Sequence, residues 1–304
     1  MELLQLKYFC TVAQLESMTE AARIHHIPQS AMSKTILKLE AELGKKLFDR
    51  VGNHLRLNHN GKSFLHHVQN GLTELNNAVF STQDPSLRKG EIKLLVMENR
   101  RRVTDAIIAF HQRYPDIQFS ISHNIYEQSH SEFDLYVASV PQEKGTFHRV
   151  FLFHEQICLA VQRSHPLSRR TSVRLEELRG ENFIFLPEKN GVNRIMMDRC
   201  RQQGLEPKIS IICDDPFYVR KYISAGLGIA FAPSDSWYGL YDETVVLVPS
   251  DDPGTARDTY LYWQRERSLS YPAVLFKDFL LEQVQEEATL KTALQDKNRE
   301  NQHK

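Results

Sequence analysis

Residues 17–57, SMTEAARIHHIPQSAMSKTILKLEAELGKKLFDRVGNHLRL, decide the fold of the N-terminal part of the chain. Ser17 and Glu20 have the spacing of a capping box, in which each side chain satisfies a free backbone amide at the start of a helix. The residues at 25–28 are typical of a tight turn, and apolar residues recur at helical spacing on both sides of them. The sequence therefore predicts a helix-turn-helix motif from Met18 to Lys38.

The helix expected after this turn, over residues 29–43, has two chemically different sides. Its apolar side chains recur at helical spacing and predict a buried stripe of Met32, Ile36, Leu39 and Leu43. The remaining side chains suit DNA, because glutamine can pair with an adenine edge, serine and threonine can donate to bases or phosphates, and lysine neutralises phosphate. A solvated helix face is the alternative. The residues expected to contact DNA, Met32 included, are Gln29, Ser30, Met32, Ser33, Lys34, Thr35 and Lys38.

A short hairpin is predicted behind this helix, with a Gly-Asn turn between two strands in the stretch 51–57. Such a hairpin is a β-wing, and we expect Arg50 and Arg56 to lie beside the phosphate backbone. The whole chain carries 38 basic and 38 acidic residues, but the stretch from Arg23 to Lys62 carries eight basic and three acidic ones. A basic head on an acidic body is typical of a protein in which one module meets phosphates.

A long amphipathic helix is expected over residues 61–88, before the hinge that Pro85 and Gly90 predict. Its apolar side chains alternate in steps of three and four, which is a heptad seam that favours a partner helix. Packing of this seam on the chain's own head is the alternative. The residues of the seam, expected to mediate dimerisation, are Leu65, Val68, Leu72, Leu75 and Val79.

From residue 91 onward, short apolar strands alternate with helical stretches, which indicates α/β layers with mostly parallel strands. We expect this body to span residues 91–290 and to form two lobes, lobe I over about 91–152 and 257–286 and lobe II over about 153–256. The last residues, 287–304, are polar and charged, and we expect them to be disordered.

The head resembles that of the LysR-type transcriptional regulators. The resemblance is carried by Leu6-Lys-Tyr-Phe9, Gln29-Ser-Ala-Met-Ser-Lys34, Leu47-Phe-Asp-Arg50 and Asn60-Gly61, and in the body by Phe133-Asp-Leu135 and Ala225-Gly-Leu-Gly-Ile229. It implies an all-α winged helix-turn-helix head (1–60) and a linker helix, followed by a two-lobed α/β effector domain like a periplasmic binding protein. It also implies a regulator that binds inverted-repeat promoter sites as a dimer or tetramer and is modulated by a small molecule in the interlobe cleft. In that family, the residues at Gln29, Ser30, Ser33 and Lys34 face DNA.

Three departures from the family pattern bear on function. Pro28 replaces the usual Ser or Thr at the start of the third helix, residues 123–132 are short and polar where a crossover helix is usual, and 98–102 read Glu-Asn-Arg-Arg-Arg where small residues are usual. Three arginines at a cleft mouth could clamp a small anionic effector, or they could form a solvated or intersubunit surface. The candidate effector-binding residues are Asn99, Arg100, Arg101, Tyr126, Asp214 and Gly228.

Several other functions find no support. The N-terminus lacks the pattern of a signal peptide and no apolar run reaches the length of a membrane span, so we expect a cytoplasmic protein rather than a secreted solute-binding protein. No catalytic fingerprint is present, the histidine pairs are adjacent rather than four apart, and the four cysteines are widely spaced, which argues against an enzyme, a metal site, a cofactor or disulfides. The expected partners are double-stranded DNA, a second copy of the chain and RNA polymerase. The alternative is a winged-helix regulator of another type, whose trimmed body serves protein–protein contact rather than effector sensing.

Overall fold

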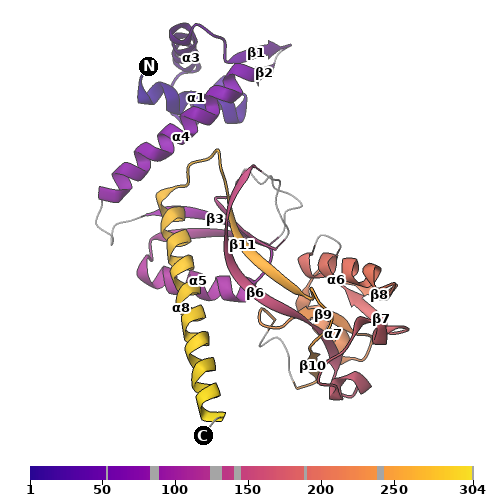
Figure 1. The fold of residues 1–304 in the computed structure, drawn as a ribbon. Coiled ribbons are helices and arrows are strands. Elements are labelled where there is room, and N and C mark those ends of the chain that lie inside the picture. Colours follow the sequence, from indigo (N-terminus) through magenta and orange to yellow (C-terminus); the bar gives the residue numbers. More distant parts are fainter. Residues whose placement is uncertain are drawn as a thin grey trace. The chain divides into compact units, whose positions relative to one another are not determined.

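The computed structural model describes residues 1–52, 54–82, 89–123, 132–139, 145–187, 190–237 and 243–302, with only the backbone for 51 and 290–302. The chain forms two compact units (Figure 1). The first unit comprises Met1–Gln83 together with the short segment Glu266–Tyr271. The second comprises Asp84–Arg265 and Pro272–Lys304.

The first unit contains the predicted helix-turn-helix. Its elements are α1 (Leu3–Leu15), α2 (Met18–Ile24), α3 (Gln29–Leu43), the hairpin strands β1 (Phe48–Val51) and β2 (His54–Leu57), and the long helix α4 (His59–Thr82). Ser17 caps α2 by accepting a hydrogen bond from the Glu20 amide at 3.2 Å, whereas the Glu20 carboxylate lies 2.8 Å from Arg23. Only half of the predicted capping box therefore forms.

The core of this unit lies where α1, α2 and α3 meet. Ala21 and Ala22 are buried at this meeting point. Their methyl side chains are small enough for the helices to approach closely. The predicted stripe of α3 is fully buried at Met32, Ile36 and Leu39, and Leu43 is partly buried at its end. The periodicity of the sequence therefore identified the packed face of α3.

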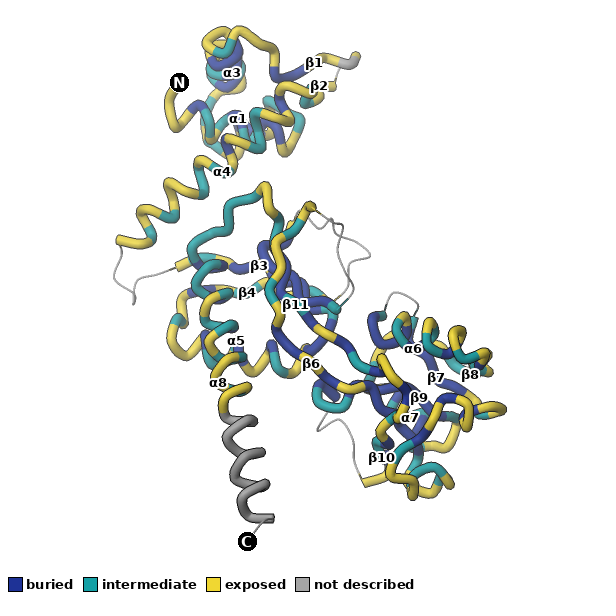
Figure 2. The backbone as a smooth tube through the Cα atoms, in the orientation of Figure 1, coloured by how far each residue is buried: buried dark blue, intermediate teal, exposed yellow. Residues whose placement is uncertain are grey.

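Helix α4 has a heptad seam with two different halves. Leu65 packs against the core of the head and Val68 is buried, whereas Leu75 and Val79 are 55% and 60% exposed. Figure 2 shows α4 as mostly exposed or intermediate. On another side of α4, the Asn77 side chain accepts a hydrogen bond from the Tyr271 amide at 2.6 Å and donates one to the Leu269 carbonyl at 2.9 Å. The N-terminal half of the seam thus belongs to the head, and the C-terminal half is open.

The second unit is built on a mixed sheet, whose strand order along the main path is β10 (Val245–Val248), β6 (Phe147–Gln162), β11 (Ala256–Gln264), β5 (Leu135–Ala138), β3 (Gly90–Val96) and β4 (Ile117–Ser122). Strand β9 (Ala230–Pro233) pairs with β6 beside this path. Lobe I contains β3 (Gly90–Val96), β4 (Ile117–Ser122), β5 (Leu135–Ala138), α5 (Arg100–Arg113) and α8 (Tyr271–Gln302). Strand β3 pairs in parallel with β4 and β5, whereas β11 (Ala256–Gln264) runs antiparallel to β5 and to the long β6 (Phe147–Gln162). The prediction of mostly parallel strands is wrong, because β6 and β11 form an antiparallel ribbon (Figure 1).

Lobe II packs around the second half of β6. It contains the 3₁₀ turns Pro166–Arg169 and Leu175–Leu178, β7 (Asn182–Phe185), α6 (Gly191–Gln202), β8 (Lys208–Ile212), α7 (Pro216–Ser224), β9 (Ala230–Pro233) and β10 (Val245–Val248). The expected border of the lobes near residue 153 falls inside β6, so one continuous strand serves both lobes. All four cysteines are free.

The C-terminal prediction of disorder over 287–304 is wrong for 287–302, because α8 continues to Gln302. The stretch is polar, but it contains no glycine or proline and is rich in Glu, Ala, Leu, Lys and Gln, which are good helix formers. Polarity alone therefore did not distinguish a solvated helix from a disordered tail.

Candidate DNA-binding face and interlobe cleft

The polar residues predicted to contact DNA lie together on the outer side of α3. Gln29, Ser30, Lys34 and Lys38 are exposed, and Ser33 and Thr35 are half-buried. The Gln29 side-chain amide donates to the Ser33 hydroxyl at 3.2 Å, so these two side chains already form a polar pair one helical turn apart. The Thr35 hydroxyl donates to the Ala31 carbonyl at 3.0 Å. The face offers both hydrogen-bond donors and acceptors at its N-terminal end, as base recognition requires.

Met32 does not belong to this face. Its side chain is 0% exposed and packs in the core among α1, α2 and α3. The residue follows the buried periodicity of α3, and its neighbours in sequence point outward instead. We therefore remove Met32 from the residues predicted to contact DNA.

The N-terminus of α3 has the open cap that Pro28 predicts. Pro28 is the N-cap residue and makes no side-chain hydrogen bond, while its carbonyl accepts from Ala31 and Met32 at 3.0 and 3.1 Å. No side chain of the described residues caps the first amides of α3, which leaves the positive end of the helix dipole open to an anion such as a phosphate.

A buried glutamate attaches the wing to α3. Glu40 is 7% exposed, and its Oε1 accepts hydrogen bonds from the amides of Leu47 and Phe48 at 2.8 and 3.3 Å. Its Oε2 lies 2.9 Å from the ammonium of Lys46. This role of Glu40 was not predicted, although a glutamate beside Leu39 on the apolar side of a helix indicates a buried acceptor.

A second glutamate holds the other wing strand. Glu16 forms an ion pair with Arg56, and its Oε1 accepts from the Leu57 amide at 2.9 Å. These hydrogen bonds, first that from Leu57 and then that from Arg56, lower the pKa of Glu16. Arg56 is therefore engaged within the head, whereas Arg50 is exposed on β1. Lys38 pairs with the exposed Glu2 at 3.4 Å, and such surface pairs contribute little to stability.

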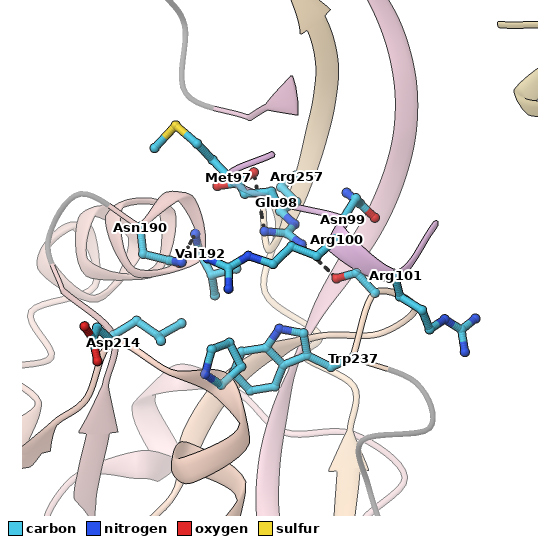
Figure 3. A pocket seen from close by; sticks show the side chains of 13 residues that line it. Met97, Glu98, Asn99, Arg100, Arg101, Asn190, Val192, Asp214, Trp237 and Arg257 are labelled. Atoms are coloured by element: carbon cyan, nitrogen blue, oxygen red, sulfur yellow. Dashed lines mark hydrogen bonds and ion pairs between the residues drawn. The ribbon is translucent and has the colours of Figure 1, made fainter. Parts of the chain in front are cut away.

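A cavity of about 220 Å³ lies between the lobes of the second unit (Figure 3). Its apolar wall is formed by Met97, Leu186, Val192, Pro216 and Trp237, and its polar lining includes the predicted residues Asn99, Arg100, Arg101 and Asp214. The Asn99 amide group turns away and donates to Glu155 and Thr259 at 3.2 and 2.7 Å. Gly228 does not line this cavity, because it packs closely against the Asn182 backbone, and Tyr126 lies outside the described residues.

The three arginines after Asn99 point in different directions. Figure 3 shows Arg100 across the cavity and Arg101 directed away from it. Desolvation lowers the pKa of Arg100, and the negative charges of Asp215, Asp214 and Glu98 oppose this shift. Arg102 lies over the ring of Phe153 at 3.8 Å and pairs with Glu287 of α8. The hypothesis that these arginines together clamp an anion is therefore wrong for Arg102, whereas Arg100 and Arg101 both line the cavity and Arg100 extends across it.

Buried charges that the sequence did not predict lie beside the cavity. The Arg257 guanidinium, in a residue that is 4% exposed, donates to Glu155 Oε1 at 2.7 Å and to Ser236 Oγ at 2.8 Å, and it lies 3.4 Å from Glu98 Oε2. Glu98 and Glu155 are also buried, at 6% and 2% exposure. These residues are far apart in the sequence, so no local pattern signals their proximity.

The described residues also bear on membrane and metal binding. No helix in the described ranges is long and apolar enough to cross a membrane. Within the same residues, no three histidine, cysteine, aspartate or glutamate side chains lie close enough together to hold a metal ion.

Comparisons with known proteins match both units. The family described as "Bacterial regulatory helix-turn-helix protein, lysR family" matches residues 3–62, and "LysR substrate binding domain" matches residues 86–285. Transcriptional dual regulator GltC of Bacillus subtilis (strain 168) is 29% identical over 291 residues, which cover 93% of this chain and 97% of GltC.

Solved structures share the fold. A full-length OxyR variant from Pseudomonas aeruginosa has a TM-score of 0.68 at 20% identity, covering 93% of this chain and 94% of that chain. Full-length CbnR complexed with its target DNA has a TM-score of 0.55 at 19% identity, covering 93% of this chain and all (100%) of that chain. The match over the body overturns the alternative of a winged-helix regulator of another type. The chain belongs to the LysR family, which comprises DNA-binding transcriptional regulators with an effector-binding domain rather than enzymes.

Proposed function

We propose that this regulator reads inverted-repeat promoter sites with α3, using Gln29, Ser30, Ser33 and Lys34 at base edges. The observation that carries the proposal is the polar pair formed by the exposed Gln29 and the half-buried Ser33 at the open N-terminus of α3. A glutamine carboxamide can form two hydrogen bonds with adenine, and the open amides favour an adjacent phosphate. Thr35, Lys38, Arg50 and Arg56 serve the phosphate backbone rather than the bases.

Two copies joined through α4 would present two recognition helices to one DNA site. Leu75 and Val79 are exposed at the end of a heptad seam, so a second copy of α4 would remove apolar surface from water. Twofold symmetry of the protein corresponds to an inverted repeat in the DNA. A tetramer would hold two such sites, and contact with RNA polymerase would follow from binding next to a promoter.

The interlobe cavity is the place for a small effector. It combines an apolar wall containing Trp237 with Arg100 and Asp214, which is the composition of a small-molecule site. An effector acts on DNA binding only through unequal affinity for two arrangements of the protein. Effector binding in this cavity should therefore change the affinity for DNA.

A direct test of base recognition uses DNA selected by the protein from a random library. Gln29→Ala should weaken binding to the preferred base at one position of each half-site by ~1–3 kcal/mol and leave binding to its variants nearly unchanged. Gln14→Ala removes the same side chain from an exposed position of α1 and should have no effect. An equal loss for Gln29→Ala on all sequences would show that Gln29 does not recognise a base.

A further inference from the structure

The carboxylate of Glu98 crosses the interlobe cleft and binds the N-terminus of a helix in the opposite lobe. Glu98 follows β3 in lobe I, and its Oε1 accepts a hydrogen bond from the Gly191 amide, the first of α6 in lobe II, at 3.1 Å. The next two amides, of Val192 and Asn193, donate to the Asn190 side chain at 3.0 and 3.4 Å. Glu98 therefore occupies the one place at this helix terminus where an anion would bind.

The fit around this carboxylate is close. A Cβ on residue 191 would lie 2.1 Å from Glu98 Oε1 and 2.2 Å from Ser139 Oγ, so glycine is needed for the approach of both groups. Ser139 Oγ and Glu98 Oε2 are buried and have no hydrogen-bond partner in the described part of the chain. Arg257 approaches the same carboxylate at 3.4 Å. An amide, a hydroxyl and a guanidinium thus surround one carboxylate group.

Arg257, and Arg100, whose positive charge also interacts with Glu98, do not alone explain why this carboxylate lies against α6. The Arg257 guanidinium already donates to Glu155, and the formal charges of two buried carboxylates exceed that of one guanidinium. A further favourable partner of Glu98 is the positive end of α6, which lies in the other lobe and donates the Gly191 amide. Removal of the Glu98 side chain would leave the Gly191 amide and the Ser139 hydroxyl facing an empty, anion-sized space.

We propose that Glu98 is an internal ligand that occupies the carboxylate position of the cleft, and that an effector binds by displacing it from α6 with a carboxylate of its own. The apolar wall of Met97, Leu186, Val192, Pro216 and Trp237 beside this position takes the body of the effector. The effector class is therefore a small carboxylic acid with an apolar or aromatic body. Without an effector, Glu98 joins the two lobes.

This inference rests on the proposed effector function of the cleft, but its test requires no DNA. Benzoate and acetate serve as probes for the full-length protein, with binding measured by calorimetry and thermal stability by scanning fluorimetry. Glu98→Ala should bind benzoate at least about tenfold more tightly than the unaltered protein, the factor expected when an internal ligand fills the site nine-tenths of the time. Saturating benzoate or acetate should also restore thermal stability that Glu98→Ala loses.

The controls separate the site from general effects. Glu91→Ala removes an exposed carboxylate from the same part of lobe I and should change neither property. Glu98→Ala combined with Gly191→Ala should bind no benzoate, because the added Cβ fills the carboxylate position. Benzamide, which lacks the charge, should not replace benzoate.

If Glu98→Ala does not fold, Glu98→Gln provides the same comparison. The neutral side chain binds the N-terminus of α6 less strongly than the carboxylate does, so this variant should still bind benzoate more tightly than the unaltered protein. Equal benzoate affinity of the unaltered and Glu98 variants, or equal rescue by benzamide, would overturn the proposal. Base recognition by Gln29 would be unaffected by that result, so failure of this inference and failure of the proposed DNA recognition are separate outcomes.

Discussion

Removal of the Glu40 carboxylate should detach the wing from α3. In Glu40→Ala, the amides of Leu47 and Phe48 lose their acceptor in a part of the head where both residues are less than one-tenth exposed. An unsatisfied buried amide costs about 1–3 kcal/mol, so two of them cost about 2–4 kcal/mol when some water enters. The lost ion pair with Lys46 adds little, because that lysine is 67% exposed.

The measurement must report on the head alone. Both tryptophans, Trp237 and Trp263, lie in the second unit, so intrinsic fluorescence does not follow the wing. Hydrogen exchange of a peptide spanning residues 45–58 reports on the wing directly. A loss of 2–4 kcal/mol in local stability corresponds to about 30-fold to 1,000-fold faster exchange of the Leu47 and Phe48 amides.

Glu42→Ala is the matched control, since it removes the same carboxylate two residues further along α3. Glu42 is on the surface and pairs with the N-terminal ammonium at 2.6 Å, not with the wing. It should leave wing exchange unchanged. Exchange at Leu47 and Phe48 that is as slow in Glu40→Ala as in Glu42→Ala would refute the role assigned to Glu40.

Three further predictions concern charge and assembly in the first unit. The hydrogen bonds from Leu57 and Arg56 lower the pKa of Glu16. The ionised carboxylate therefore stabilises the head fully above the ordinary glutamate pKa of about 4.3, and this stabilisation is lost as the pH falls through the lowered pKa. The difference in unfolding free energy of the head between the unaltered protein and Glu16→Gln, followed by NMR, should therefore be largest near neutral pH and vanish in acid; a constant difference would contradict this assignment. Val79→Glu should shift the protein toward monomers in analytical ultracentrifugation, whereas Asn76→Glu, also exposed on α4, should not; equal effects would exclude the seam as the interface. Arg50→Ala should weaken binding to every DNA sequence alike and reduce the slope of log affinity against log salt by about 1, and an unchanged slope would show that Arg50 meets no phosphate.

The first unit could be predicted well because its information is local. Helical spacing placed Ile36 and Leu39 inside and Gln29 and Lys34 outside, and both assignments depend only on 3.6 residues per turn. The wrong prediction for Met32 came from its proximity to Gln29 in the sequence. Its position in the apolar stripe of α3 determines instead that it is buried. The anchoring role of Glu40 depends on a hairpin that packs back on α3, which periodicity does not describe.

The cleft was harder to predict, because its important contacts join distant parts of the chain. Glu98 contacts Gly191, which is 93 residues away in the sequence, and Arg257, which is more than 150 residues away. The local pattern that pointed to a charged cleft was the run Arg100-Arg-Arg102. That run suggested an anion clamp, but a helix places successive residues about 100° apart, and the three side chains diverge. The sequence around Glu98 does not indicate that its carboxylate accepts a hydrogen bond from the N-terminus of a helix in the other lobe.

The most direct test of DNA recognition by α3 is footprinting of the purified full-length protein on the DNA that it selects. We expect two protected half-sites in inverted repeat, with centres about one helical turn or a multiple apart, and loss of discrete protection in the double variant Gln29→Ala, Ser33→Ala. Protection without a repeat, or a footprint that these two substitutions leave unchanged, would contradict this expectation.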